Sequence, residues 1–436
     1  MAKKKKIDRN ALYQSKDFDP KAALAEKYGK GVIDSMENIL GDDDDLVIIP
    51  SSSARLNLAM GTGGFVKRGI YEVAGSSGSG KTSTCLDLIA QAQLLGLHCV
   101  YVDAEGGVDL EWARKIGVDT GELEMAWPDN GEQALEIVDM YARSGTADVI
   151  VVDSVAALTP SKELNEEDLA DKHMALQASM MSKHMRKITM GVMQNEVCLT
   201  FVNQYRDGIG GPQGSYKKTT GGNALTYYCH ARIGMGPVQN GVIKTGEVAT
   251  GTTVRAKVTK NRFAPPMTEC QLYIDFLAGG IDRPRELLLD GIDNKLVYTS
   301  GRSFIYLPPG VEDKEDGTVL ATDGLSSAVA GLREDDDTMD EIDDRLQVLA
   351  EEKKAAKAAA AADKRAKAKA KAKEAQAKRA EKRAKLAAKA APKDEDFLIV
   401  GGGAAPRKKT TKKKTTKKKA AKKKAAKKAT KTEVAG

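Results

Sequence analysis

Short apolar runs alternate with segments in which apolar residues recur at helical spacing. Runs rich in β-branched residues predict strands at residues 70–75, 99–105, 148–153 and 197–202. Helical spacing predicts helices at residues 85–95, 108–116, 131–144 and 169–193. Strands that alternate with helices predict an α/β fold, in which helices cover both faces of a mostly parallel sheet. Three later runs have no helices between them and predict antiparallel strands that extend this sheet, at residues 226–235, 252–259 and 270–276.

The segments on either side of this core have patterns of their own. Residues 20–36 predict a short amphipathic helix, and residues 46–50 predict a strand. Beyond the core, the pattern predicts a helix at 286–290, a strand pair at 296–299 and 304–307, and a helix at 340–349. We therefore predict four parts: an N-terminal segment at 1–45, a core at 46–280, a small α+β domain at 281–350 and a tail at 351–436.

The tail changes the electrostatic picture of the chain. Residues 351–436 hold 31 Lys and Arg against 9 Asp and Glu, a net charge of +22, whereas residues 1–350 have a net charge of −15. An acidic body with a basic tail is typical of proteins that bind polyanions. Residues 353–391 are mostly Ala and Lys, so a single solvated helix and a disordered chain are equal alternatives. Residues 394–400 are apolar and acidic, as in a docking peptide or a spacer.

Cysteine usage and hydropathy favour a cytoplasmic protein. The five cysteines contain no CxxC pair, and most lie in apolar runs, so we expect buried, reduced thiols. No apolar stretch reaches the roughly 18 residues that a membrane span needs, and we expect no membrane contact. The N-terminal lysines are not followed by the apolar region of a secretory signal.

A phosphate-binding loop joins the strand at 70–75 to the helix that follows. Residues 75–82 (GSSGSGKT) fill every required position of GxxxxGK[ST], and they stand between a strand and a helix, as that motif requires. Backbone N–H groups of such a loop bind phosphate oxygens, with the lysine at the β- and γ-phosphates and the hydroxyl on Mg²⁺. We assign nucleotide binding to Gly75, Ser76, Ser77, Gly78, Ser79, Gly80, Lys81, Thr82 and Ser83.

Two carboxylates follow predicted strands of the same sheet. Asp153 ends the apolar strand at 148–153, and Glu105 ends the strand at 99–105. Open parallel sheets bind ligands at the carboxyl ends of their strands, so both side chains are expected beside the phosphate loop. Thr82 and Asp153 would hold Mg²⁺, because hydroxyl and carboxylate oxygens are its usual protein ligands.

Five further segments together resemble one family. Residues 101–105 (YVDAE), 131–136 (GEQALE), 150–160 (IVVDSVAALTP), 201–206 (FVNQYR) and 219–225 (TTGGNAL) are similar to segments of the bacterial RecA recombinases. The resemblance runs in order from about residue 20 to residue 350. It implies a RecA-type P-loop NTPase core and an ATP-dependent recombinase that forms homo-oligomeric filaments on single-stranded DNA.

The resemblance also implies roles for individual residues. Glu105 matches the catalytic glutamate that orients water, and Gln204 matches the γ-phosphate sensor. Lys81 completes the catalytic set. Trp112 occupies the position that stacks on adenine, although a half-buried core residue is the alternative. Lys260 and Arg262 match basic positions that reach the ATP of the neighbouring protomer, and the helix at 20–36 matches the segment that packs on the next subunit or, alternatively, on its own core.

Two loops match the DNA-binding loops of the family. The second, residues 207–220, is rich in glycine, and the residues assigned to DNA in and after it are Tyr216, Lys217, Lys218, Thr220, Gly221, Gly222 and Asn223. A solvated loop is the alternative. The first, residues 161–172, is acidic, which is unusual for the family. After it, Met174, Ser182 and Arg186 match DNA-contacting positions, but Ser179 replaces the common arginine.

The leading functional hypothesis is a DNA-dependent ATPase that pairs homologous DNA strands in recombination and repair. We expect the tail and the small domain to capture double-stranded DNA. Two alternatives are a protein that compacts the nucleoid and a related ATPase of the same fold, such as a hexameric helicase.

Overall fold

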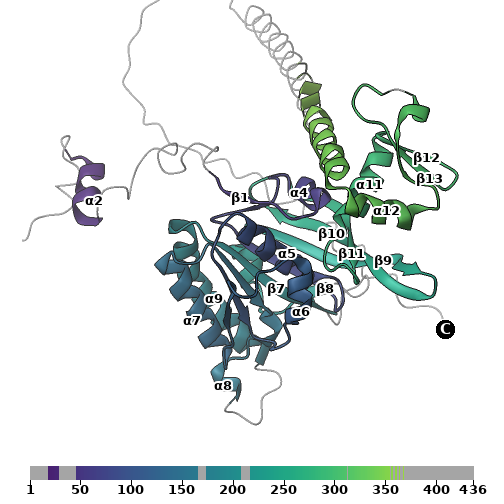
Figure 1. Ribbon diagram of the computed structural model, residues 1–436. Coiled ribbons are helices and arrows are strands. Elements are labelled where there is room, and N and C mark those ends of the chain that lie inside the picture. The colour runs from purple at the N-terminus through teal and green to yellow at the C-terminus, as the bar shows by residue number, and fades with distance from the viewer. Residues whose placement is uncertain are drawn as a thin grey trace, which may run out of the picture. The chain divides into compact units, whose positions relative to one another are not determined.

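The computed structural model describes residues 18–28, 46–164, 173–207, 217–311 and 313–353, together with 355, 356, 359, 360, 363 and 367. Chain contacts divide the protein into two units, Met1–Lys354 and Ala355–Gly436. The first unit contains both the core and the small domain (Figure 1). The predicted boundaries within this unit, after residue 45 and after residue 280, stay predictions.

A nine-stranded sheet forms the centre of the core, as the α/β pattern predicted. Its strands lie in the order β11-β10-β9-β3-β7-β6-β4-β5, with β8 paired to β7. All pairs from β9 to β5 along this order are parallel, and β10, β11 and β8 are antiparallel to their neighbours. The bounds are β3 Ile70–Gly75, β4 Cys99–Asp103, β5 Glu124–Ala126, β6 Val149–Asp153, β7 Cys198–Asp207, β8 Lys217–Thr219, β9 Ala231–Thr245, β10 Val248–Asn261 and β11 Thr268–Asp275.

Helices cover both faces of the sheet, and the alternation of strand residues sorts the core into two clusters (Figure 1). Tyr101 and Val151 join the cluster under α5 (Lys81–Leu94) and α6 (Leu110–Ile116). Val152 joins the other cluster, under α7 (Gly131–Ser144) and α9 (His173–Gln194). Four of the five cysteines are buried free thiols in these clusters, and Cys270 is half-buried. None of the helices described here is long and apolar enough to cross a bilayer.

Several sequence expectations need correction. The strand expected at 226–235 begins only at Ala231, because residues 224–228 form the short helix α10 (Ala224–Tyr228). Side chains from β10 and the residues after it hold the last carbonyls of α10, which stabilises a helical turn in a β-prone sequence. In addition, β9 is parallel to β3, not antiparallel.

The N-terminal expectations are confirmed only in part. The helix expected at 20–36 is present as α2 (Pro20–Tyr28), and residues 29–36 lie outside the described residues. The strand expected at 46–50 is reduced to β1 (Ile48–Ile49), which pairs with β2 (Phe65–Val66) outside the main sheet. The helix α4 (Ala54–Met60) between them was not predicted; Ser53 caps it by accepting from the Leu56 N–H.

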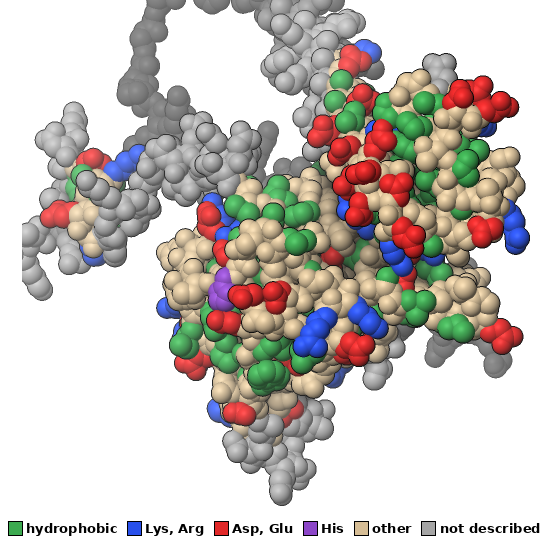
Figure 2. All heavy atoms as spheres, viewed as in Figure 1, with side chains coloured by type: hydrophobic (Ala, Val, Ile, Leu, Met, Phe, Trp, Pro, Cys, Tyr) green, Lys and Arg blue, Asp and Glu red, His purple; other side chains and the backbone are tan. Residues whose placement is uncertain are grey.

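The small domain has the predicted α+β composition and its own apolar cluster. It contains α11 (Arg283–Asp293), the sheet β12-β13-β14 and α12 (Leu325–Glu334), followed by helical residues 336–353. The strands are β12 Val297–Ser300, β13 Ser303–Tyr306 and β14 Thr318–Ala321. Figure 2 shows that acidic side chains gather over this domain.

A buried carboxylate joins the small domain to the core. Glu286 of α11 is 1% exposed, and its Oε2 accepts a hydrogen bond of 2.7 Å from the Ser53 hydroxyl at the start of α4. Its Oε1 has no hydrogen-bond partner in the described part of the chain. Burial raises the pKa of Glu286 to about 8, although Ser53 and the nearby Arg55 guanidinium act in the opposite direction. Arg55 itself forms an ion pair with Asp290 at 2.8 Å.

The raised pKa of Glu286 predicts a pH-dependent stability. The folded protein keeps the proton that the unfolded chain loses above its ordinary pKa, so the free energy of unfolding should fall between about pH 5 and pH 8. The slope for one proton is about 1.4 kcal/mol per pH unit. Glu286→Gln should remove that contribution, which denaturant unfolding of both proteins across this range would measure. Parallel pH profiles would contradict this assignment.

Candidate functional site

The phosphate loop follows β3 and leads directly into α5, so the N-terminal N–H groups of a 14-residue helix face it. A Cβ on Gly75 would lie 2.3 Å from the Ser79 hydroxyl and 2.6 Å from the Met235 carbonyl oxygen of β9, so only glycine fits there. Gly78 and Gly80 have positive φ. The Ser79 hydroxyl donates to the Ser76 carbonyl at 2.8 Å, which closes the loop on itself.

Lys81 lies at the first position of α5, and its side chain folds back over the loop. Its Nζ donates to the Ser76 carbonyl oxygen at 2.8 Å. Burial lowers the pKa of Lys81, and the carboxylates of Asp153 and Glu105 oppose that shift. A helix N-terminus with a lysine ammonium beside a nest of N–H groups is suited to phosphate oxygens, so the residues present fit a nucleoside triphosphate.

Asp153 ends β6 and connects three elements of the site. Its Oδ2 accepts from the Thr82 hydroxyl at 2.9 Å and from the Tyr101 hydroxyl at 2.8 Å. Burial raises the pKa of Asp153, while these two hydrogen bonds lower it. The Thr82 and Asp153 oxygens fit Mg²⁺, which typically takes one or two protein oxygens together with phosphates.

Glu105 and Gln204 meet at the same edge of the sheet. The Gln204 amide donates to Glu105 Oε1 at 2.9 Å, and the Ser154 hydroxyl donates to the same oxygen. Asp103 holds the turn after Glu105, because its carboxylate accepts from the Gly106 N–H at 2.8 Å. The exposed Glu105 carboxylate is therefore oriented from two sides. The structure brings together Lys81, Thr82, Glu105, Asp153 and Gln204, and their roles stay predictions.

Trp112 lies beside the start of the phosphate-loop helix. Its indole N–H donates to the Ser83 hydroxyl at 3.1 Å, and its half-buried ring packs against the core cluster under α5 and α6. This position agrees with the core alternative and leaves part of the ring exposed. Adenine stacking stays a prediction.

Lys260 and Arg262 do not bond to the phosphate loop of their own chain. Lys260 Nζ donates to the carbonyl oxygens of Thr226 at 2.7 Å and Tyr227 at 3.1 Å, and Arg262 donates to Tyr227 at 2.8 Å. Both cations therefore cap the C-terminal end of α10. Their predicted reach to the nucleotide of a neighbouring protomer is a proposal.

A buried polar network continues from Gln204 to the end of the second predicted DNA loop. The side-chain amide oxygen of Asn203 (Oδ1) accepts from the Gln204 N–H at 2.8 Å and from the Thr220 hydroxyl at 2.5 Å. The Asn203 amide donates to Glu72 at 2.8 Å, and Glu72 is paired with Arg232. Both Asn203 and Glu72 are fully buried, so the network fixes Thr220 relative to β3, β7 and β9.

The structure describes only part of the predicted DNA surface. Ser182 is half-buried and Arg186 exposed on α9, and Asn223 is exposed before α10. Lys217 and Lys218 lie in β8, and Met174 lies in the first turn of α9. Tyr216 lies outside the described residues, as do residues 165–172 of the first loop, which begins with α8 (Ser161–Leu164).

Comparison with known proteins decides the family. The RecA N-terminal domain model matches residues 21–282. The chain is 39% identical over 361 residues to Protein RecA of Haemophilus ducreyi, which covers 80% of this chain and 92% of that protein. It is 42% identical over 285 residues to Protein RecA 2 of Myxococcus xanthus, covering 65% of this chain and 78% of that protein.

The chain belongs to the RecA family. As a RecA recombinase it is assigned to DNA recombination and repair, and the two alternatives, a nucleoid-compacting protein and another ATPase of the same fold, are not favoured. The RecA family is also an ATPase family.

Three positioning residues of this RecA site were missed in the sequence. Tyr101, Ser154 and Asn203 all bond to site carboxylates or to the loop end. Ser154 and Asn203 are each adjacent to a predicted site residue, Asp153 and Gln204 respectively. Tyr101 lies in the strand that leads to Glu105. Polar residues inside or just after apolar strands were the available signal, because such groups are buried only with partners.

The phosphate loop gives a matched pair of glycine substitutions. Gly75→Ala places a Cβ against the Met235 carbonyl of the adjacent strand, so we expect a loss of about 2 to 3 kcal/mol in unfolding free energy. Gly78→Ala meets nothing within 4 Å, so only its positive φ opposes the change, at about 1 kcal/mol. Denaturant unfolding compares the two. Equal losses would show that the close approach at Gly75 does not limit the loop.

Proposed function

We propose that the chain is a DNA-dependent ATPase, in which ATP bound at the phosphate loop controls a filament on single-stranded DNA. One observation carries this proposal: adjacent residues of β7 contact the two sites. Gln204 contacts Glu105 beside the phosphate loop, and Asn203 contacts Thr220 at the end of the second predicted DNA loop. A change at the nucleotide that moves Gln204 would therefore also move its neighbour Asn203, and with it the end of the loop.

The side chains present supply the requirements of phosphoryl transfer. Lys81 provides positive charge to the β- and γ-phosphates, and the N–H groups of residues 76–83 hold their oxygens. Mg²⁺ supplies further positive charge at the phosphates when bound beside Thr82 and Asp153. Glu105, oriented by Ser154 and Gln204, accepts a hydrogen bond from the attacking water and increases its nucleophilicity.

Assembly would complete this site. Lys260 and Arg262 lie together at the end of α10, and Arg262 is exposed. Burial and the Arg262 charge lower the pKa of Lys260, as expected for two cations held close together. In a filament, an anionic nucleotide on the neighbouring protomer would neutralise this pair. We further propose that α2 packs on the next protomer, as its match to the family's N-terminal segment implies.

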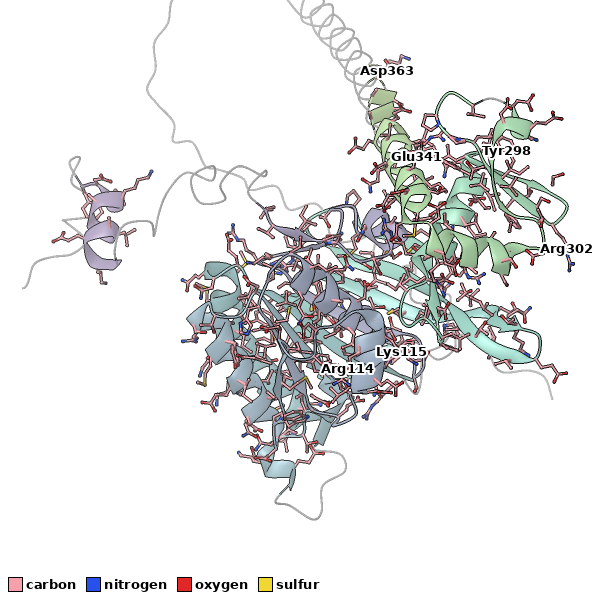
Figure 3. All side chains as sticks on the ribbon, in the orientation of Figure 1. Arg114, Lys115, Tyr298, Arg302, Glu341 and Asp363 are labelled. Carbon is pink, nitrogen blue, oxygen red and sulfur yellow. The ribbon has the colours of Figure 1, made fainter. Side chains whose placement is uncertain are left out.

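Double-stranded DNA would be captured outside the core. The tail supplies a net charge of +22, and in the small domain Arg302 is exposed at the turn between β12 and β13 (Figure 3). Lysine-rich chains bind phosphates without reading sequence, because the interaction depends on charge and counterion release. We propose that this capture supplies duplex to the filament.

The role of Glu105 is tested by Glu105→Gln in the full chain. Without a carboxylate to accept the proton of water, ATP hydrolysis stimulated by single-stranded DNA should fall at least about a hundredfold, while ATP binding persists. Glu111→Gln is the matched control, because Glu111 is an exposed carboxylate of α6 that pairs only with Lys115 among the described residues, at 3.8 Å. Unchanged hydrolysis by Glu105→Gln, or hydrolysis by the unmodified protein that ignores DNA, would refute the proposed function.

The tail proposal is tested by salt titration of duplex binding. If six tail lysines contact phosphates, the plot of log K for duplex binding against log salt concentration should have a slope that is steeper by about 5 for the full chain than for a chain ending at Ala350. ATP hydrolysis on single-stranded DNA should be retained by the shorter chain. Equal salt slopes for the two proteins would rule out duplex capture by the tail.

A further inference from the structure

We propose that Gln177 is a positioning residue that ties the ends of both predicted DNA loops to the turn that follows Asp153. The proposal rests on the proposed function, because it gives the nucleotide site a second connection to DNA besides Gln204 and Asn203. Neither the sequence motifs nor the catalytic roles above use Gln177.

Gln177 bonds to the backbone of two distant segments. Its amide nitrogen donates to the carbonyl oxygens of Val155 at 2.8 Å and Leu158 at 3.1 Å. Val155 begins the 3-10 turn after Asp153, and Leu158 directly follows that turn. Its amide oxygen accepts from the Gly221 N–H at 3.1 Å, one residue after Thr220. One side chain thus uses both donors and its acceptor on backbone groups.

The position of Gln177 in the chain gives these bonds their meaning. It lies in the first turns of α9, four residues after His173, where the described chain resumes after the first predicted loop. Gly221 follows the second predicted loop, and Val155 follows Asp153 by two residues. Gln177 therefore joins one end of each loop to the end of β6, within a single half-buried side chain.

The backbone after the second loop is packed closely against the same two elements. A Cβ on Gly221 would lie 2.8 Å from the Val155 side chain, and a Cβ on Gly222 would lie 2.6 Å from that of Ala178. Both glycines have positive φ. Because these segments are closely packed, a shift of the turn after Asp153 would move the loop end and the start of α9 together.

A purely structural role for Gln177 predicts something different from a positioning role. If the bonds of Gln177 are purely structural, their loss should lower the stability of the protein equally in both nucleotide states. A positioning bond transmits nucleotide state, so its loss should reduce the difference between DNA affinities in two nucleotide states while ATP affinity stays unchanged.

The test uses the full chain and a fluorescent oligothymidine strand, titrated with ADP or with a slowly hydrolysed thiophosphate analogue of ATP. Gln177→Met keeps the side-chain length and removes all three bonds. Gln93→Met is the matched control, because the Gln93 amide also bridges backbone, with both bonds to Asp119 at 2.9 Å, far from either loop in sequence. Hydrogen exchange of the peptide containing Gly221 monitors the bond itself.

We expect Gln177→Met to reduce the ratio of the two affinities roughly tenfold, and Gln93→Met to preserve it. Exchange at Gly221 should quicken only in Gln177→Met. Should that variant fail to fold, Gln177→Glu, which keeps the acceptor for Gly221 but loses both donors, should reduce the ratio in its place.

An unchanged ratio in a folded Gln177 variant, or an equal loss in Gln93→Met, overturns the inference and leaves the proposed function intact. If the unmodified protein binds the strand equally with both nucleotides, the proposed function itself fails, and the inference fails with it.

Discussion

The arrangement of the predicted nucleotide site depends on the hydrogen bonds that the buried Asp153 carboxylate accepts. A carboxylate that is 6% exposed is tolerated only with hydrogen-bond donors, and here the donors are hydroxyls from the phosphate-loop helix and from β4. The helix, β4 and β6 are thereby held in one arrangement. Glu105 follows β4, Ser154 follows β6 and Gln204 belongs to β7, so the geometry of the reacting groups follows from this arrangement.

Local signals were sufficient for the centre of the fold. The apolar runs at 99–105 and 148–153 and the GxxxxGK[ST] motif indicated parallel strands with Glu105 and Asp153 at one edge of the sheet. The structure has these strands in the sheet as β4 and β6, and it shows in addition that they are neighbours. The strand predicted at residues 226–235 was wrong in part. Long-range bonds from Lys260 and Arg262 stabilise α10 there, although local propensity favours a strand. Contacts such as Gln177 to Gly221 span 44 residues and have no periodic signature, so no pattern could reveal them.

The two kinds of DNA contact proposed for this chain differ in their physical basis. Contacts at the loop next to the nucleotide site would depend on a few backbone positions held by Asn203 and Gln177, so they would respond to geometry. The proposed contacts by the lysine-rich tail would depend on charge density, so they would respond to ionic strength and tolerate changes in sequence. Acidic side chains gather over the small domain (Figure 2), and their charge would repel DNA, so the DNA contacts proposed for this domain would depend on exposed cations such as Arg302.

The three consecutive serines before α4 have a mechanical consequence. Ser51 donates to Asp87 on the phosphate-loop helix at 2.7 Å, and Ser53 donates to Glu286 in the small domain at 2.7 Å. The short segment from Ser51 to Ser53 therefore connects the phosphate-loop helix to a domain more than 200 positions further along the chain. A displacement of that helix would therefore be passed to the small domain through two hydrogen bonds and the short rigid segment between them.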